Sequence, residues 1–135
     1  MSNIQREIRS ALETNLSSVV DVPQIAYENV PYKPTTGTSY IQINYLPTSR
    51  RPSVRGLNPI QRYEGIFAIT CYAPEGNGPD AAEEIAENVM NAFEATTSLT
   101  SNNATVSIDY SEVKQGYLDS PWFVVPVNIG WYAYN

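Results

Sequence analysis

Apolar and polar residues follow two different periods along this chain. In residues 3–18 and 80–93 the apolar positions recur every three or four residues, which predicts two amphipathic helices. Apolar and polar residues alternate over 40–46, which indicates a half-buried strand. Residues 63–73 are apolar on both faces, which predicts a central strand covered on both sides. Further extended segments are expected at 25–30, at 106–110 continuing toward 113, and at 122–134.

The order of these elements predicts an α+β fold. One mixed or antiparallel sheet of about five strands is expected, flanked by the two helices, with loops at 96–103 and 116–121. Pro126 cannot donate a hydrogen bond, so the last strand is expected at a sheet edge or bulged there. At 135 residues, the length suits one domain spanning 1–135.

The regular pattern disappears between residues 47 and 62. This segment contains three prolines, one glycine and four arginines, and little that a core could bury. A long loop or extended arm is therefore expected, and an excursion of this length is usually functional or disordered.

Charge is distributed unevenly. Four of the eight basic residues lie in the arm, and six of the fourteen acidic residues lie between 75 and 94, where no basic residue occurs. Both segments suit solvated surfaces. A second hypothesis pairs the arm of one copy with the acidic helix of another, because arginine suits carboxylate contacts and head-to-tail contacts close into rings. A third places the arm against phosphates of a polyanion. The candidate residues are Arg50, Arg51, Arg55 and Arg62 in the arm, and Glu83, Glu84 and Glu87 in the helix.

No residue pattern indicates catalysis. The chain has no histidine, the commonest general base and metal ligand. Cys71 suits a buried strand position, and the turn at 76–78 lacks the third glycine and the lysine of nucleotide-binding loops. The three helix glutamates suit a solvated face better than an acid pair or a metal site. We expect a non-enzyme without cofactor or metal.

Composition also limits the partners. The net charge of −6 argues against free-standing nucleic-acid binding, and no apolar stretch is long enough to span a membrane. The N-terminus lacks the apolar block of a signal peptide, and a single cysteine provides no disulfide framework, so synthesis in a reducing compartment is expected.

Three stretches together resemble the tail terminator-like proteins of tailed bacteriophages. They are AYENVPYKPTTGTSYIQINYLP, GIFAITCYAPEGNGPDAAEEIAENVMNAF and WFVVPVNIGW. The resemblance spans nearly the whole chain, and it lies in the order and spacing of structural motifs rather than in catalytic residues.

This resemblance implies a structural protein of the virion, made in the host cytoplasm. Proteins of this kind cap the head-proximal end of the tail tube as a ring, typically of six copies. The ring stops tube polymerisation and presents a surface to the head connector or neck protein above, with the tube protein below. A non-specific DNA contact in the lumen is a further expectation.

Two alternatives remain open from the sequence. The first is another neck, head–tail joining or tail-tube subunit. The second is a small soluble domain that binds a ligand along its aromatic last strand, through Trp122, Trp131, Tyr132 and Tyr134. Such a strand is more often sheet core or oligomer interface.

Overall fold

Two helices and seven strands make up the described part of the fold. The computed structural model describes residues 4–19, 23–52, 60–76, 78–95, 97–101 and 104–134. The helices are α1 (Ile4–Ser17) and α2 (Asp80–Ala92). The strands are β1 (Gln24–Ala26), β2 (Tyr40–Pro52), β3 (Gln61–Pro74), β4 (Ser98–Ser101), β5 (Ala104–Val113), β6 (Tyr117–Asp119) and β7 (Trp122–Tyr134).

All seven strands belong to one mixed sheet. Their order is β1-β2-β3-β7-β5-β4, and β6 also pairs with β7. Only β1 and β2 run parallel among these pairs. The α+β class and the two amphipathic helices are confirmed, but the sheet has more strands than the expected five. The difference comes largely from β4 and β6, which are four and three residues long and lie in segments predicted as loops. Strands this short present too few positions for alternation to be recognised.

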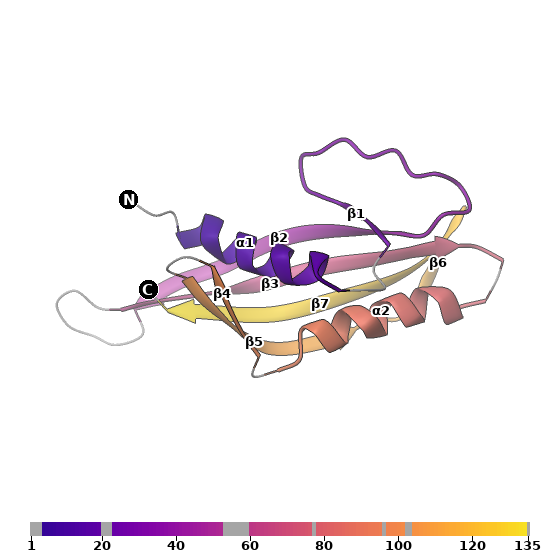
Figure 1. The fold of residues 1–135 in the computed structure, drawn as a ribbon. Coiled ribbons are helices and arrows are strands. Elements are labelled where there is room, and N and C mark those ends of the chain that lie inside the picture. Colours follow the sequence, from indigo (N-terminus) through magenta and orange to yellow (C-terminus); the bar gives the residue numbers. More distant parts are fainter. Residues whose placement is uncertain are drawn as a thin grey trace.

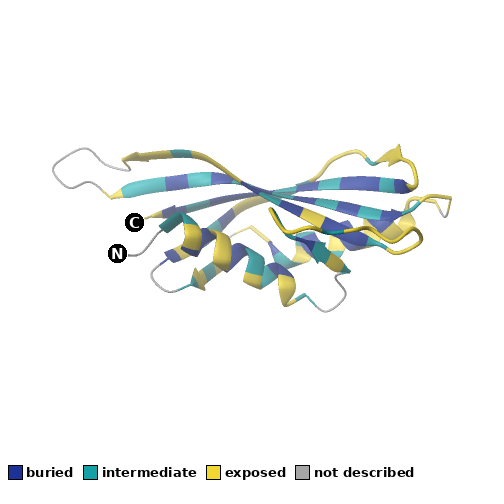
Figure 2. Cartoon of the chain, turned by 90° about the horizontal axis from the view of Figure 1, so that it is seen from above, coloured by how far each residue is buried: buried dark blue, intermediate teal, exposed yellow. Residues whose placement is uncertain are grey.

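Both helices lie on the same face of the sheet (Figures 1 and 2). Their apolar stripes cover the odd-numbered positions of β3 and β7, and this layer forms the main core. Leu12 of α1 and Val89 of α2 are fully buried there, together with Phe67 and Ile129 of the sheet. The predicted covering of the central strand is therefore correct for one face.

The other sheet face carries no helix among the described residues. Even-numbered β3 residues such as Ile66 and Thr70 are half-buried there by neighbouring side chains of the sheet. At one end of this face, the rings of Tyr40 and Tyr72 stack at 4.4 Å, and Trp122 meets Tyr40 edge-on at 5.2 Å. These aromatic contacts between strands form a second, smaller core on the face that no described helix covers.

Pro126 lies in an interior strand, so the prediction of an edge position or a bulge at this residue was wrong. β7 pairs continuously with β3, including Thr70 opposite Pro126. On its other side, β7 pairs first with β6 and then with β5. The carbonyl of Pro126 accepts a hydrogen bond from the Lys114 N–H just beyond β5. The proline nitrogen faces this same side, so its missing N–H falls where one neighbouring strand gives way to another.

The described part of the predicted loop at 47–62 is largely a two-stranded β ribbon. β2 and β3 remain paired as far as Pro52 opposite Gln61, with a register shift between Pro47 and Ser49 (Figure 1). The irregular-loop prediction was therefore wrong for 47–52 and 61–62, while 53–59 lies outside the described residues. Pairing with β3 holds this part of β2 although its sequence does not alternate, because backbone hydrogen bonds need no apolar face.

Candidate functional site: the arginine ribbon

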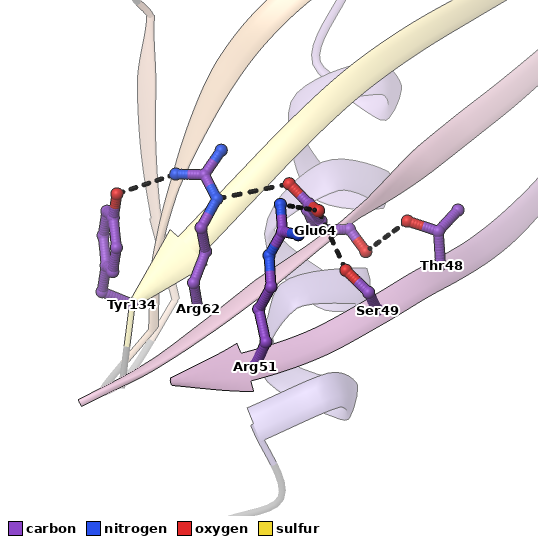
Figure 3. Close-up of polar contacts among 6 residues, drawn as sticks. All are labelled: Thr48, Ser49, Arg51, Arg62, Glu64 and Tyr134. Atoms are coloured by element: carbon purple, nitrogen blue, oxygen red, sulfur yellow. Dashed lines mark hydrogen bonds and ion pairs between the residues drawn. The ribbon is translucent and has the colours of Figure 1, made fainter. Parts of the chain in front are cut away.

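We call residues 47–52 of β2 and 61–64 of β3 the arginine ribbon. Glu64 is its polar centre (Figure 3). One carboxylate oxygen accepts hydrogen bonds from Ser49 Oγ and Arg51 Nη2, both at 2.9 Å. The other accepts from Arg62 Nε at 3.2 Å. At the register shift, Thr48 Oγ1 donates to the Glu64 backbone carbonyl at 3.1 Å. One acidic side chain thus ties both strands of the ribbon together.

Arg62 connects the ribbon to the last strand of the sheet. Its Nη1 donates to Tyr134 Oη at 2.7 Å (Figure 3), and its guanidinium also lies 4.4 Å from the ring centre of Tyr132. Planar guanidinium groups suit this combination of stacking and forked hydrogen bonding. The C-terminal end of β7 and the base of the ribbon are consequently held as one unit.

The hydrogen bonds around Glu64 fix its charge. The bond from Ser49, followed by that from Arg62 and the charge of Arg51, keeps the pKa of Glu64 below its ordinary value. The carboxylate is ionised at neutral pH and faces two permanent cations. The cluster of Arg51, Arg62 and Glu64 therefore has one excess positive charge.

Arg50 differs from these two arginines. It lies opposite Tyr63, whose side chain is buried on the helix-covered face, whereas Arg51 lies opposite Arg62 on the helix-free face. Its side chain is exposed and forms no ion pair with any described residue. Arg55, the fourth candidate arginine, lies outside the described residues.

The candidate glutamates lie far from the ribbon in the same chain. Glu83, Glu84 and Glu87 are exposed on α2, and none forms an ion pair within the described part of the chain. Figure 1 shows α2 and the ribbon at opposite ends of the molecule. The structure therefore brings Arg51 and Arg62 together with Glu64, and it does not bring the arginines to the helix glutamates.

Sequence reasoning missed Glu64, Ser49 and Tyr134. Two of these had a recognisable signal. Ser49 and Arg51 share one strand face because they are two residues apart, and the same holds for Arg62 and Glu64. Tyr134 had no such signal, because its approach depends on β7 pairing beside β3.

The four residues of the predicted aromatic ligand site do not converge. Trp122 belongs to the aromatic cluster with Tyr40, on the helix-free face. Trp131 is buried on the opposite face, where it stacks on Tyr45 at 5.4 Å. Tyr132 and Tyr134 lie beside Arg62. These four rings therefore line no common cavity.

A groove lies elsewhere, between β2 and the segment that follows β1. It has a volume of about 530 Å³ and is lined in part by Tyr27, Tyr32, Gln42 and Asn44. Next to it, the Glu28 carboxylate accepts the Tyr45 N–H at 2.6 Å, which satisfies a donor on the outer edge of β2.

The described residues contain no group of three potential metal ligands. Cys71 is fully buried, as predicted, and burial raises the pKa of its thiol to about 12. A thiol of this kind is un-ionised at neutral pH and unsuited to nucleophilic attack. Neither described helix has the length and apolar character needed to cross a membrane.

Solved structures with a similar fold include two that cover this whole chain. One, whose name states no function, shares 23% identity with a TM-score of 0.77 and covers 100% of this chain and 96% of its own. The other, described as the virion of native gene transfer agent (GTA) particle, shares 11% identity with a TM-score of 0.67 and covers 100% of both chains. At these identities the likeness concerns the fold.

No match was found among curated protein sequences. The sequence model described as phage tail terminator protein matches residues 7–131. That match covers almost the whole chain and includes the three stretches on which the resemblance rests. This chain therefore belongs to the phage tail terminator protein family.

Proposed function

We propose that this protein is a tail terminator that forms a ring on the head-proximal end of a phage tail tube. The ring, typically of six copies, stops tube polymerisation and joins the tail to the head connector. Residues 1–135 act as one domain in this role. The observation that carries the proposal is the family match over residues 7–131.

This role places the protein in the virion, after synthesis in the host cytoplasm. Its neighbours are the tail tube protein below and the connector or neck protein above. The ring also contacts DNA in the lumen without sequence specificity. The function is mechanical and does not involve a chemical reaction. The extended ribbon supports this role, because it offers a neighbouring copy a rigid projection beyond the helices (Figures 1 and 2).

The inter-subunit contacts of this ring involve the ribbon and the acidic helix. The basic group comprises Arg50, Arg51, Arg55 and Arg62, and the acidic group comprises Glu83, Glu84 and Glu87. Opposite charges at opposite ends of one subunit favour a head-to-tail contact, which is the type that closes rings.

Assembly of the purified protein tests the proposed function. Its mass is measured by light scattering, and negative-stain images are recorded with and without tail tubes. We expect discrete rings, or monomers that form one ring at a tube end. Open-ended tubes formed by the protein alone would identify a tube subunit instead. A monomer that does not bind tube ends at any concentration would contradict the tail assignment.

A further inference from the structure

We propose that Arg50 is the ribbon arginine that contacts a second copy of this chain, and that its partner is the exposed acidic face of α2. Arg51 and Arg62 instead hold the ribbon in shape. This inference rests on the proposed ring, and it assigns different roles to arginines that the sequence groups together.

The two faces of the ribbon separate these roles. On the helix-free face, Arg51 and Arg62 already donate hydrogen bonds to Glu64, and Arg62 also donates one to Tyr134. Moving either guanidinium to another copy would break a hydrogen bond that the Glu64 carboxylate accepts. Arg50 points to the opposite face and has no counter-ion among the described residues. It can pair with a neighbour without breaking any described ion pair.

Among the described residues, the acidic face of α2 has no counter-ion in its own chain. Glu83 and Glu87 are four residues apart, and Glu84 and Glu87 are three apart, so all three lie close together on the helix surface. Like charges at these spacings destabilise a helix. The helix N-terminus offsets this cost for Glu83 in the first turn, but its effect falls off before Glu87. A cation from another molecule would relieve the repulsion.

Distance excludes this contact within one chain. Arg50 lies beside Tyr63, whereas α2 begins after Pro74 at the other end of β3 and packs back over that half of the sheet through the Phe93–Phe67 contact. Phe67 is four residues from Tyr63, or about 13 Å at 3.3 Å per strand residue, and the three glutamates lie further toward the N-terminus of α2, so they are on the order of 20–30 Å from Arg50. Among the described residues, each subunit thus presents an unpaired cation at one end and an unpaired anionic face toward the other.

The charges favour a second copy over a polyanion. Only Arg50 is uncommitted among the described ribbon arginines, and the chain has a net charge of −6. Binding to a phosphate backbone depends on several neutralised phosphates. A single arginine opposite three carboxylates instead matches a contact that is repeated once per subunit around a ring.

Charge reversal on both sides tests the contact. The variants are Arg50→Glu, the pair Glu83→Arg with Glu87→Arg, and all three changes combined. Lys33→Glu is the matched control, because it makes the same charge change on an exposed side chain. Lys33 belongs to the segment between β1 and β2, which lies away from the ribbon (Figure 1). The fraction of rings is measured against protein concentration by analytical ultracentrifugation, and circular dichroism verifies folding.

We expect Arg50→Glu and the α2 variant each to raise the concentration for half-assembly by about tenfold, since one weak exposed contact recurs at every interface of the ring. The combined variant should have a half-assembly concentration within about threefold of the wild-type value, and Lys33→Glu should have the wild-type value. Unchanged assembly of Arg50→Glu, or no recovery in the combined variant, would overturn the contact while the ring itself stands. Arg50→Glu that assembles normally but binds double-stranded DNA more weakly would identify a polyanion as the partner. Wild-type protein that never forms rings, alone or on tubes, would contradict the proposed function and this contact together.

Discussion

The ring of Tyr110 lies directly over Gly130 on the neighbouring strand. The two residues are paired across β5 and β7, just after a register shift between Ile108 and Tyr110. A β-carbon at position 130 would overlap the tyrosine ring. Tyr110 thus occupies the space that the missing side chain leaves on the helix-free face.

Replacing Gly130 with alanine should therefore lower the free energy of unfolding less than replacing Gly65 with alanine. Tyr110 is 39% exposed, so its ring can move aside. At Gly65, a β-carbon would overlap the Leu46 carbonyl oxygen and lie 2.9 Å from Pro47 Cα, at the ribbon's register shift. We expect Gly65→Ala to lower the free energy of unfolding by about 2–3 kcal/mol and Gly130→Ala by about 1 kcal/mol. Urea unfolding measures both, and equal losses would show that the backbone at Gly65 can adjust.

Replacing Glu64 with glutamine should loosen the ribbon. The amide removes the charge that Arg51 and Arg62 share and can no longer accept on both of its terminal atoms. Because these groups are partly exposed, we expect a loss of only about 1 kcal/mol in unfolding free energy. Faster hydrogen exchange in the ribbon is expected as well. Exposed Glu94, which forms no ion pair with a described residue, supplies the control Glu94→Gln.

The Glu64 contribution should depend on pH in the acidic range. Its hydrogen bonds hold the pKa below the ordinary value of 4.5, so the unfolded state takes up the proton first as pH falls. The stabilisation is therefore complete above the unfolded pKa and is lost as pH falls through the folded pKa. The stability difference between wild type and Glu64→Gln should be constant from about pH 6 to 8 and should shrink below about pH 4. A difference that is unchanged at pH 3 would mean that the carboxylate charge contributes nothing.

Cys71 should not react with thiol reagents in the folded protein. It is fully buried in β3, and burial raises its pKa to about 12. Since the thiolate is the reactive form, we expect Ellman's reagent at pH 8 to titrate one thiol only after unfolding in denaturant. Rapid reaction of the native protein would reveal opening of the helix-covered face, which hydrogen exchange can verify independently.

Phe93→Ala should be the most destabilising change at the junction of α2 and the sheet. Phe93 is fully buried and lies 5.9 Å from the Phe67 ring, centre to centre. Truncation leaves a cavity beneath the C-terminal end of the helix, so we expect a loss of about 3–5 kcal/mol. Tyr117→Ala is the control, because Tyr117 is 50% exposed on β6 and its truncation should lower the free energy of unfolding by under about 1 kcal/mol. Thermal unfolding, monitored by circular dichroism, compares the two variants.

Local periodicity was sufficient to predict both helices and the long strands. Residues 80–93 were predicted as helical and α2 spans Asp80–Ala92, while the last strand was predicted at 122–134 and β7 has those bounds. These elements are long, and their side chains repeat at the period of the structure they form. Family membership was also readable, because it depends on the order of motifs along the chain.

The candidate site depended on contacts between distant segments. The sequence predicted a cationic arm, yet pairing between β2 and β3 turned its base into a ribbon and placed Arg50 and Arg51 on opposite faces. Strand pairing brings Arg51 and Arg62 to Glu64, and it also places Pro126 in an interior strand. No local sequence pattern specifies these cross-strand neighbours.

The sequence alone therefore determined the helices, the main strands, the family and the separation of charge between arm and helix. Only the tertiary structure decided that both described helices lie on one face of the sheet and that Arg51 and Arg62 donate hydrogen bonds to Glu64. The physical reason is that periodicity reports which side of an element is apolar. Strand register determines which side chains meet, and register is a property of two chain segments together.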